Sequence, residues 1–517
     1  MTQPAKSPLG IDLGTTFSVA AQVDASGRPC SIPNAEGDVL TPSVVFFDET
    51  SMVVGKEALK AASLEPDRAF QSVKREMGHA VCGKAIGGEF FPPEVIQSLI
   101  LEKVKRDAEV KIGLVNDVVI TVPAYFNEPR RKATQDAGRL AGLNVIDIIN
   151  EPTAAAIAFG VREGFLDEAG ESKRSELVLV FDLGGGTFDV TLMRIDGKNY
   201  TVIATDGNFM LGGIDWDRRI VERLVAAFLD QHQIDLNTDP VGLQRLLREA
   251  DDAKRALSTR DKVTVAFEHG GRGIKLPLTR AEFEAMTADL LERTRFTTSN
   301  MLRLAKARWG QLTRVLLVGG STRMPMVAAM LEHESGKSPD RSLAADEAVA
   351  HGAAIYAKLL ASAGTLNNER VTITNVNSHS LGVLGTDPET QRPGNKVMLA
   401  RNTPLPATKA SSFKTRTRDQ RSVVVNVIEG GDASGNHSTP IGRCVVRDLP
   451  PGLPAGTPVD VTFSYTTNGR LSVHARLPRL GREARLEIER ASGLSDEKIE
   501  EWTGRLRNGL RPLNLDL

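Results

Sequence analysis

The residues that could do chemistry gather in one glycine-rich stretch, Leu177–Val190, which reads LVLVFDLGGGTFDV. Its first five residues have the length and β-branching of a buried strand. The glycines Gly184–Gly186 allow a tight turn whose backbone N–H groups can contact an anion. Asp182 would repel a phosphate unless a cation lay between them. The stretch therefore indicates a site for a metal-bound phosphate, although a lone glycine triplet can equally form an ordinary hairpin turn beside a buried strand.

A near-repeat of this stretch occurs close to the N-terminus. The segment Leu9–Thr16 reads LGIDLGTT and again places an aspartate, Asp12, between a hydrophobic run and a glycine followed by threonines. Two such hairpins in one chain suggest two similar lobes that hold one phosphate chain from opposite sides. The repeat therefore favours nucleotide binding over an ordinary turn.

Two further glycine pairs fit the same interpretation. Gly319-Gly320 lies between an expected strand and an expected helix, where the base and sugar of a nucleotide could approach bare backbone. Gly212-Gly213 provides another turn of close approach. The chain has neither the GxxxxGK[ST] motif nor a GxGxxG motif after a strand, which argues against a simple phosphate-binding loop and against a dinucleotide enzyme.

The elements that must position these residues follow an α/β pattern up to about residue 360. Hydrophobic runs predict strands at 9–13, 17–23, 43–47, 117–122, 177–183, 187–194, 199–204 and 314–318. Amphipathic spacing predicts helices near 93–110, 127–141, 152–160, 215–232, 241–258, 280–306, 324–334 and 346–361. On the expected helix 241–258, Asp251, Lys254, Arg255 and Ser258 share one face. By itself this pattern is more typical of a solvent-exposed charged face than of a binding site.

The periodicity changes after about residue 365. Short alternating segments replace helices, and Asn468-Gly469 between two of them predicts a hairpin turn in an antiparallel β unit over roughly 377–490. The polar segment Asn367–Val376 is a plausible linker. Ser495 resembles the N-cap of one short helix that runs to about Arg507.

The overall composition restricts the class of protein. The formal net charge of −1 gives no electrostatic case for nucleic acid or an anionic membrane surface. The three cysteines lie far apart without a CxxC motif, so neither a disulfide framework nor a zinc site is indicated. No hydrophobic run approaches membrane-spanning length, and the first residues are too few and too polar for a signal peptide. We therefore expect a cytoplasmic protein.

Six motifs, in order along the chain, resemble those of the Hsp70 (DnaK-type) chaperone family. They are GIDLGTTFS (10–18), VPAYFNEPRR (122–131), INEPTAAA (149–156), VFDLGGGTFDV (180–190), LGGIDWD (211–217) and LVGGSTR (317–323). The resemblance implies an α/β actin-like, two-lobed ATPase domain, an all-β peptide-binding sandwich and a short C-terminal helix. The implied boundaries are 1–365 for the ATPase domain, 366–376 for the linker, 377–490 for the sandwich and 491–517 for a helical tail.

The same resemblance assigns roles to individual residues. The implied cofactors are ATP or ADP and Mg²⁺, with K⁺ as a candidate; Asp12 and Asp182 would hold Mg²⁺ through its waters, and Asp189 would help to place a monovalent cation. Lys74 would position the attacking water, and Glu151 would orient water or metal; the implied catalytic set is Lys74, Glu151, Asp182 and Thr187. Without the resemblance, Lys74 would be read as a surface lysine. The implied nucleotide-binding residues are Gly14, Thr15, Thr16, Gly184, Gly185, Gly186, Gly212, Gly213, Lys254, Arg255, Ser258, Gly319, Gly320, Ser321, Arg323 and Asp346.

Residues implied to link the two domains or to bind peptide complete the set. Pro123 and Arg131 match the family's proline–arginine relay between the ATP and peptide states. Leu381, Phe413 and Val423 fit the pattern of the peptide groove, although all three could equally be core residues. Arg416 replaces the family's small residue that arches over bound peptide, so its length and charge would alter the groove.

The chain departs from the family pattern in its C-terminal part. Two threonines in Val371–Asn375 replace linker leucines, so the linker would bury less hydrophobic surface on docking. Each lost methylene would weaken docking by about 0.8 kcal/mol. Asn375 replaces an aspartate, and Asp147 stands where the DnaK type has an arginine used in J-domain docking. The chain ends where the family's long helical lid would begin, so we expect weak peptide binding with fast release.

The sequence thus predicts an ATPase that binds exposed hydrophobic segments of unfolded polypeptides, with a J-domain protein and a nucleotide exchange factor as candidate partners. Three alternatives stay open. A scaffold or co-chaperone would bind nucleotide but use its β domain for one fixed protein partner. An actin-like filament protein would share the ATPase architecture, but the appended β-sandwich argues against it. A sugar kinase would share the two-hairpin site, but the sequence shows no separate sugar-binding segment.

Overall fold

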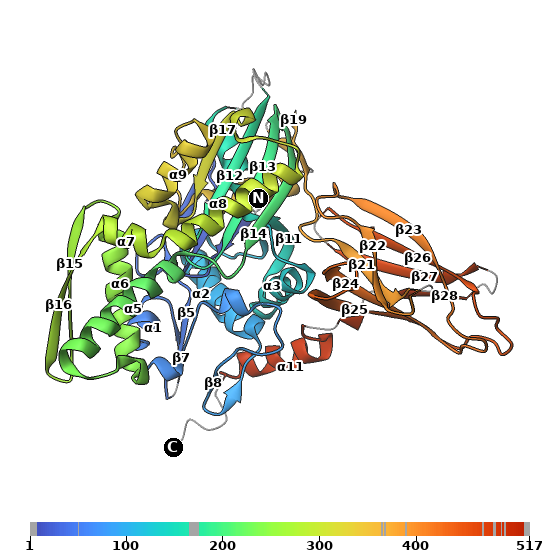
Figure 1. Ribbon diagram of the computed structural model, residues 1–517, viewed down its shortest axis with the longest axis horizontal. Helices are drawn as coiled ribbons and strands as arrows, with labels where there is room; N and C mark the ends of the chain where they lie inside the picture. The colour runs from blue at the N-terminus through green and yellow to red at the C-terminus, as the bar shows by residue number, and fades with distance from the viewer. Residues whose placement is uncertain are drawn as a thin grey trace, which may run out of the picture.

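The computed structural model describes residues 8–49, 51–164, 175–362, 365–366, 369–387, 390–467, 470–478, 482–486, 489–490 and 493–510. Two mixed β-sheets form the centre of its larger part (Figure 1). The first has the order β11 (Asn144–Asn150), β10 (Asp117–Val122), β1 (Leu9–Leu13), β2 (Phe17–Val23), β3 (Pro29–Ile32), with β4 (Thr41–Pro42) beside β2. The second has the order β17 (Arg314–Val318), β12 (Glu176–Leu183), β13 (Phe188–Asp196), β14 (Asn199–Asn208), β20 (Thr372–Thr374).

The two sheets share a central arrangement. In each, an antiparallel hairpin, β1–β2 or β12–β13, carries a parallel strand on its outer side, β10 or β17. Each hairpin turn is one of the aspartate–glycine motifs, so the prediction of two similar lobes from the internal repeat is confirmed. The strand β11 was missed, because its sequence NVIDIIN mixes polar and hydrophobic residues without a regular period.

Two helices lie between the sheets. α4 (Glu151–Arg162) and α10 (Ala348–Ala361) join residues of both sheets in one hydrophobic cluster, and they pack closely on one another. The contact depends on small residues: a Cβ added to Gly352 would lie 1.7 Å from the carbonyl oxygen of Ala154, and one added to Gly10 would lie 2.1 Å from the backbone nitrogen of Ala354. The separation of the two lobes is therefore set by glycine and alanine at this seam.

Gly352→Val is expected to destabilise the chain by about 3 kcal/mol or more, because the backbone of α4 must shift to admit the side chain. Differential scanning calorimetry should show a clearly lowered unfolding temperature. The matched control is Gly310→Val, since a Cβ at Gly310 meets no atom within 4 Å. Equal unfolding temperatures for the two variants would contradict the assigned role of the seam.

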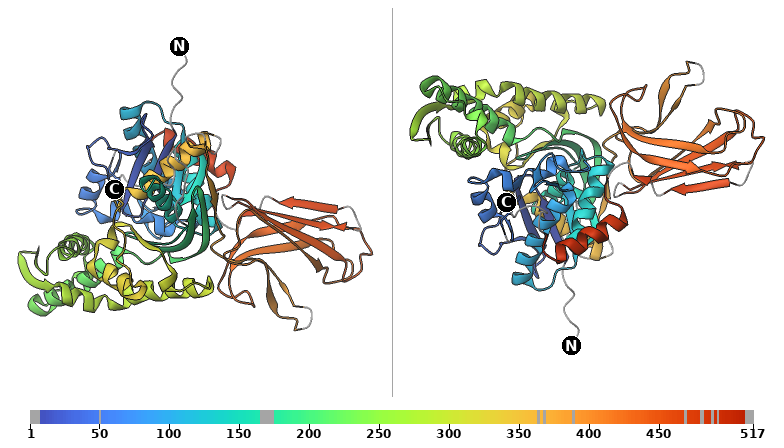
Figure 2. Two further views of the ribbon diagram at one scale, coloured as in Figure 1. Left: turned by 90° about the horizontal axis from the view of Figure 1, so that it is seen from above. Right: turned by 90° about the horizontal axis from the view of Figure 1, so that it is seen from below.

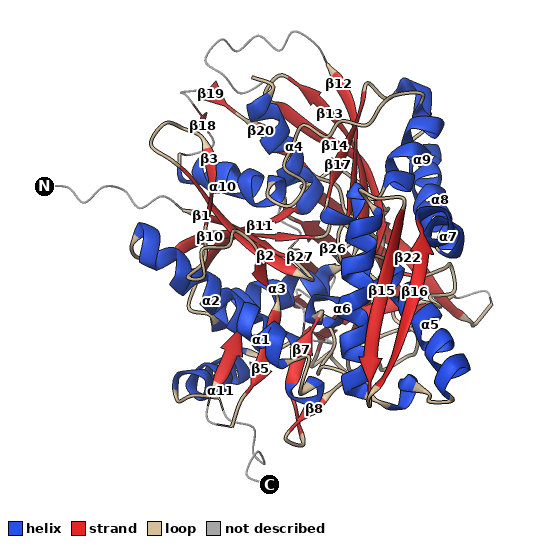
Figure 3. Ribbon diagram, turned by 90° about the vertical axis from the view of Figure 1, so that its left-hand side faces the viewer, coloured by secondary structure: helices blue, strands red, loops and turns tan. Residues whose placement is uncertain are grey.

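The outer faces of the sheets are covered by longer helices. α2 (Pro93–Ile112) and α3 (Glu128–Leu140) cover the first sheet, and α5 (Gly213–His232), α6 (Pro240–Leu257), α8 (Ala288–Leu304) and α9 (Pro325–Ser335) belong to the core beside the second. The hairpin of β15 (Lys262–His269) and β16 (Arg272–Thr279), which was also missed, lies beside α6 and α5 (Figure 3). The smaller elements of this part are β5 (Val44–Phe47), β6 (Met52–Val54), α1 (Lys56–Ala61), β7 (Ala69–Gln71), β8 (Ala85–Ile86), β9 (Glu89–Phe90), β18 (Thr365–Leu366) and β19 (Glu369–Arg370).

One predicted helix is wrong in its extent. The segment 280–306 is two helices, α7 (Arg280–Met286) and α8, which are separated at Thr287. The backbone of Thr287 leaves helical geometry (φ −116°, ψ 9°), and its buried hydroxyl donates to the carbonyl oxygen of Phe283. The break is one residue long, and hydrophobic spacing does not reveal it.

The C-terminal part is a β-sandwich that projects from the side of the two-lobed part (Figures 1 and 2). One sheet has the order β22 (Pro393–Leu399), β21 (Leu381–Thr386), β24 (Val423–Gly430), β25 (Ser438–Val446), β29 (Glu489–Arg490). The other has the order β23 (Ala407–Lys414), β26 (Pro458–Tyr465), β27 (Leu471–Leu477), β28 (Arg482–Leu486). β26 and β27 pair as expected up to Tyr465 and Leu471, while Asn468-Gly469 lies outside the described residues.

The segment expected to be a linker adds a strand to the second sheet. β20 pairs in parallel with β14, and Tyr200 stands opposite Ile373. Val371 and Ile373 pack against the cluster between the two lobes, in which Val376 is buried. The segment between the two parts of the chain is therefore docked on the edge of the larger part.

The last helix, α11 (Asp496–Arg507), returns to the first lobe, far from it in sequence (Figures 1 and 2). The Ser495 side chain accepts from the Lys498 N–H at 3.3 Å, which confirms the predicted N-cap. Trp502 is buried beside Phe91, with ring centroids 6.0 Å apart, and Arg505 makes a two-pronged ion pair with Glu89. No helix in the described part of the chain is both long and hydrophobic enough to cross a membrane.

Candidate functional site

The two aspartate–glycine turns meet face to face between the lobes. A Cβ added to Gly185 would lie 2.1 Å from Oγ1 of Thr16, and one added to Gly186 would lie 2.2 Å from Cγ2 of Thr15. Oγ1 of Thr16 is buried and has no hydrogen-bond partner among the described residues. The two turns thus form a tight cradle of backbone and hydroxyl groups that carries an unsatisfied polar atom, as a phosphate-binding site would.

The start of α5 closes this cradle. The N–H groups of Gly213 and Ile214 donate to the carbonyl oxygens of Gly184 and Gly185 at 3.0 and 2.8 Å. A Cβ on Gly212 would lie 2.6 Å from the backbone of Gly186, so only glycine fits. The glycines of the motifs VFDLGGGTFDV (180–190) and LGGIDWD (211–217) therefore lie together.

Four carboxylates gather beneath the turns. Asp182 and Asp189 stand directly opposite each other on β12 and β13, and both are buried, as is Glu151 at the start of α4. Asp12, at the end of β1, accepts a hydrogen bond from Oγ1 of Thr121 at 2.9 Å.

The crowding shifts the titration of these groups. Burial and the charge of Glu151 raise the pKa of Asp12 to about 7 and that of Asp189 to about 8, and they hold the pKa of Asp182 well above its usual range. Negative charge is thus costly here unless a cation is present. This donor set fits Mg²⁺ bound with a phosphate chain. No group of three or more His, Cys, Asp or Glu side chains that could hold a metal ion is found in the described ranges.

Lys74 is the cation that faces these carboxylates. It lies in a short 3₁₀ turn, Val73–Glu76, and only 4% of its surface is exposed. Its Nζ donates to Oε1 of Glu151 at 2.5 Å. Burial opposes its charge, but Glu151 and Asp12 raise the pKa of Lys74 above its ordinary value, so it stays protonated. The alternative that Lys74 is a surface lysine is wrong.

Sequence reasoning missed the neighbouring Arg75. This side chain is also buried; its Nε donates to the carbonyl oxygen of Gly186 at 2.7 Å, and its Nη2 pairs with Asp215 at 2.6 Å. Asp215 in turn accepts from the N–H of Gly212 at 2.8 Å. Arg75 therefore ties the first lobe to the glycine turn. In the sequence, the position of Arg75 next to Lys74 is the one feature that could have indicated this role.

The residues predicted to surround the nucleoside lie on the opposite wall. Oγ of Ser321 donates to the carbonyl oxygen of Gly184 at 2.9 Å, and Asp346 forms an ion pair with Arg323. A Cβ on Gly319 would lie 2.6 Å from Oδ1 of Asp182, and one on Gly320 would lie 2.9 Å from Oδ1 of Asp346. Both glycines thus allow close approach.

The charged face of α6 is not simply solvent-exposed. Lys254 is 8% exposed, its Nζ lies 2.7 Å from Oδ1 of Asp217, and it donates to the carbonyl oxygen of Gly213 at 3.3 Å. The solvent-exposed interpretation is therefore wrong for Lys254. Arg255, whose side chain is 57% exposed, lies over the ring of Phe17 at 5.8 Å. Ser258 caps the end of α6 and turns its hydroxyl to the backbone of Lys254.

The predicted relay residues lie behind the carboxylates. Nη2 of Arg131 donates to Oδ1 of Asn150 at 2.6 Å, directly before Glu151. Nε of Arg131 donates to the carbonyl oxygen of Phe126, in the turn where Phe126 N–H donates to the carbonyl oxygen of Pro123. The two residues are therefore joined by one turn, next to a carboxylate of the site.

A short chain of contacts joins the site to the β-sandwich. The Tyr125 N–H donates to Oδ1 of Asp189 at 2.9 Å, and the Tyr125 ring lies 4.3 Å from that of His379 in the sandwich. Beside them, Oε2 of Glu429 accepts from the N–H of Glu128 at 3.0 Å. Burial raises the pKa of Glu429 to about 7. Tyr125 thus contacts both Asp189 of the carboxylate site and His379 of the sandwich.

The predicted groove residues have different surroundings. Leu381 and Val423 are buried in the hydrophobic core of the sandwich, and Phe413 packs against that core. Arg416 is exposed, and its N–H donates to Oε1 of Gln420 at 2.9 Å. Two residues that differ from the family pattern, Asp147 and Asn375, both accept hydrogen bonds. Oδ2 of Asp147 accepts from the Tyr356 hydroxyl at 2.7 Å, and Oδ1 of Asn375 accepts from Oγ1 of Thr153 at 3.3 Å.

Comparison with known proteins gives a consistent result. The family model described as Hsp70 protein matches residues 8–508. Chaperone protein DnaK from two strains of Halobacterium salinarum, R1 and NRC-1, is 40% identical to this chain over 501 residues, which cover 95% of this chain and 76% of each relative. Together with the two-lobed fold, the β-sandwich and the paired glycine turns, this extent of similarity shows that the chain belongs to the Hsp70 family.

Proposed function

We propose that this chain is an ATP-dependent molecular chaperone that hydrolyses ATP and binds exposed hydrophobic segments of unfolded polypeptides. The observation that carries this function is the site between the lobes, where two glycine turns meet above four carboxylates and one buried lysine. Membership of the Hsp70 family supports the same activity.

In this proposal the glycine turns bind the phosphates, and Lys74 acts on the reacting phosphate. Its Nζ is held by Glu151, so it can orient an attacking water and stabilise the charge that develops on the terminal phosphate. Arg75 holds the two lobes in register over the glycine turn. Lys254, Arg255 and Ser258 on one side, with Gly319–Ser321, Arg323 and Asp346 on the other, would contact the nucleoside.

Mg²⁺, when bound with ATP, offsets phosphate charge and favours attack on the terminal phosphate. Asp12 and Asp182 would hold it through water. Asp189 would help to place a monovalent cation, for which K⁺ is the candidate. The raised pKa values of these aspartates support this assignment, because each would be relieved by a bound cation.

The domain boundaries follow from the same proposal. Residues 1–365 would form the ATPase domain, 366–376 the linker, 377–490 the peptide-binding sandwich and 491–517 a helical tail. Leu381, Phe413, Arg416 and Val423 would shape the peptide groove, and a change in packing could expose Leu381 or Val423. A J-domain protein and a nucleotide exchange factor are proposed partners. Contact with the J-domain protein would differ from that of the DnaK type, because Asp147 replaces an arginine and Asn375 replaces an aspartate. A cytoplasmic location stays a prediction.

Hydrolysis would be coupled to peptide binding through the docked arrangement. The contacts that support this are the strand β20 on β14, and the path from Asp189 through Tyr125 to His379. A change in the position of Asp189 would be transmitted to the sandwich by a hydrogen bond and a ring contact. Docked and undocked forms would then differ in peptide affinity, and ATP would shift their populations.

Release of a fluorescent unfolded peptide tests this function. The peptide is bound to the full chain with ADP, and the change in anisotropy is followed after addition of Mg-ATP. We expect ATP to accelerate release by at least tenfold, and the time course also measures whether release is as fast as the sequence leads us to expect. A peptide that stays bound at the same rate with either nucleotide would favour a scaffold that holds a fixed partner.

A further inference from the structure

A cavity of about 700 Å³ lies between the two parts of the chain, outside the nucleotide site. One wall includes His79, Tyr125 and Arg130 of the first lobe, together with Phe209, which directly follows β14. The other wall comes from the sandwich. A cavity of this size fits a small organic ligand rather than a few waters. Since both walls are needed, the cavity exists only when the two parts are docked.

Arg130 is the charged side chain of this cavity that has no partner. It is 8% exposed, and no carboxylate of the described residues lies within ion-pair distance of its guanidinium. Its Nε is buried without a hydrogen-bond acceptor. The guanidinium carbon lies 3.8 Å from the ring centroid of Phe209, so one face of the group is covered by an aromatic ring. A buried arginine held in this way is costly unless an anion pairs with it.

Arg401 and Glu429, which also line the cavity, have contacts of their own. Arg401 pairs with Asp206 at 2.7 Å and donates to the carbonyl oxygen of Thr205 at 2.7 Å. Glu429 accepts from the Glu128 N–H, and its second oxygen lies 3.7 Å from Nδ1 of His379. Glu429 acts on Arg130 from beyond ion-pair distance. The lining therefore offers one unpaired guanidinium.

Further side chains able to donate hydrogen bonds line both walls of the cavity. The imidazoles of His79 and His437 and the hydroxyls of Ser380 and Thr439 line the same cavity. Each can donate a hydrogen bond to an oxyanion. A planar guanidinium in a cavity with several further donors can bind a carboxylate or a phosphate by two parallel hydrogen bonds.

We propose that this cavity is a binding site for a small carboxylate or phosphate anion, with Arg130 as its principal contact. Because the anion contacts both walls, it binds the docked form and stabilises docking. It is thus an effector site separate from the ATP site. The existence of an undocked form is taken from the proposed function. Binding of the anion in the cavity itself does not require ATP hydrolysis.

Isothermal titration calorimetry of the full chain tests this proposal. The nucleotide site is first saturated with Mg²⁺ and a non-hydrolysable ATP analogue, so that it cannot take up the probe. Malonate and inorganic phosphate are then titrated separately. We expect one site for at least one of them, and the stronger probe distinguishes a carboxylate ligand from a phosphate ligand.

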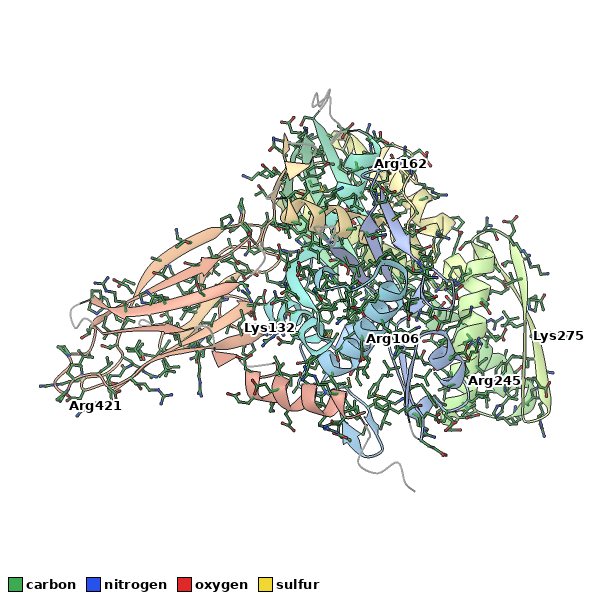
Figure 4. All side chains as sticks on the ribbon, turned by 180° about the vertical axis from the view of Figure 1, so that it is seen from behind. Arg106, Lys132, Arg162, Arg245, Lys275 and Arg421 are labelled. Carbon is green, nitrogen blue, oxygen red and sulfur yellow. The ribbon has the colours of Figure 1, made fainter. Side chains whose placement is uncertain are left out.

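Variants locate the site. Arg130→Gln should weaken binding by about tenfold or more, since it removes a charge-assisted, two-pronged contact. Arg130→Lys keeps the charge but loses the planar fork, so it should weaken binding severalfold. Arg106→Gln is the matched control, because Arg106 is exposed on α2 in the ATPase part (Figure 4). Saturation of each variant by the ATP analogue shows that it is folded.

Two results would overturn the proposal. One is no binding of either anion to the unaltered chain. The other is equal affinity in Arg130→Gln and Arg106→Gln, which would place any bound anion elsewhere. Neither result depends on peptide release, so the failure of this site and the failure of the chaperone function are distinguishable.

Discussion

Replacement of Lys74 by alanine is expected to slow single-turnover ATP hydrolysis by about 10²–10³-fold, the usual effect of removing one group that stabilises developing charge. The reason is its position: Nζ is buried, stays protonated and is fixed at 2.5 Å from Glu151. The rate is measured by rapid mixing of the full chain, in excess, with radiolabelled Mg-ATP. ATP affinity should change much less, because the glycine turns are intact.

The control for this variant is Lys111→Ala, an exposed lysine in the same lobe. It should hydrolyse ATP at the unaltered rate. A Lys74→Ala chain that binds ATP and hydrolyses it within a few-fold of that rate would remove Lys74 from the chemistry. Loss of ATP binding together with hydrolysis would instead mean that the site has collapsed, so both quantities are measured on each sample.

Ile373→Asp is expected to abolish the stimulation of hydrolysis by peptide while it leaves basal hydrolysis in place. Ile373 lies on β20 opposite Tyr200 and packs against the hydrophobic cluster between the lobes. A carboxylate at this position would have to lose its hydration to dock, so the undocked form is favoured. The ratio of single-turnover rates with and without an unfolded peptide should fall to about one.

The matched control is Thr372→Asp, on the neighbouring residue of the same strand. Thr372 is exposed, so its replacement adds the same charge without burying it. Stimulation by peptide should survive in this variant. Equal loss of stimulation in both variants would mean that charge near the linker matters more than docking of β20.

Most of the site could be predicted because its chemistry depends on local motifs. A hydrophobic run that ends in an aspartate and glycines specifies a strand and its turn, and both examples were placed correctly at β1–β2 and β12–β13. The repeat also predicted the relation of the two lobes. Gly212 and Gly319 lie where neighbouring backbone or side-chain atoms leave no room for a Cβ atom. Each belongs to a glycine pair, and such a pair can be recognised in the sequence.

Residues whose place in the site the local pattern does not show depend on contacts between distant segments. Lys74 and Arg75 are adjacent basic residues in an irregular turn, and nothing local distinguishes them from a surface pair. Their burial follows from Glu151 and Asp215, far along the chain. The spacing on α6 by itself likewise favoured an exposed Lys254, because its partner Asp217 lies on another helix; only the family resemblance placed Lys254 at the nucleotide.

Docking of the C-terminal part was also beyond the sequence pattern. The polar segment that ends at Val376 was consistent with a free linker, yet it completes a sheet through backbone hydrogen bonds that any residue can make. The helix α11 was predicted with its N-cap, but its packing of Trp502 on Phe91 joins the end of the chain to the first lobe. Hydrophobic periodicity and capping residues predict that such a strand or helix exists, but they do not predict which part of the molecule it packs against.

The coupling of the two parts is the central claim, and one measurement tests it most directly. Single-turnover ATP hydrolysis by the unaltered full chain is compared with and without an unfolded hydrophobic peptide. Acceleration by the peptide is predicted, since the peptide favours release of the sandwich from Tyr125 and hence a change at Asp189. Hydrolysis at one rate under both conditions would contradict a coupled chaperone and would favour an ATP-binding scaffold.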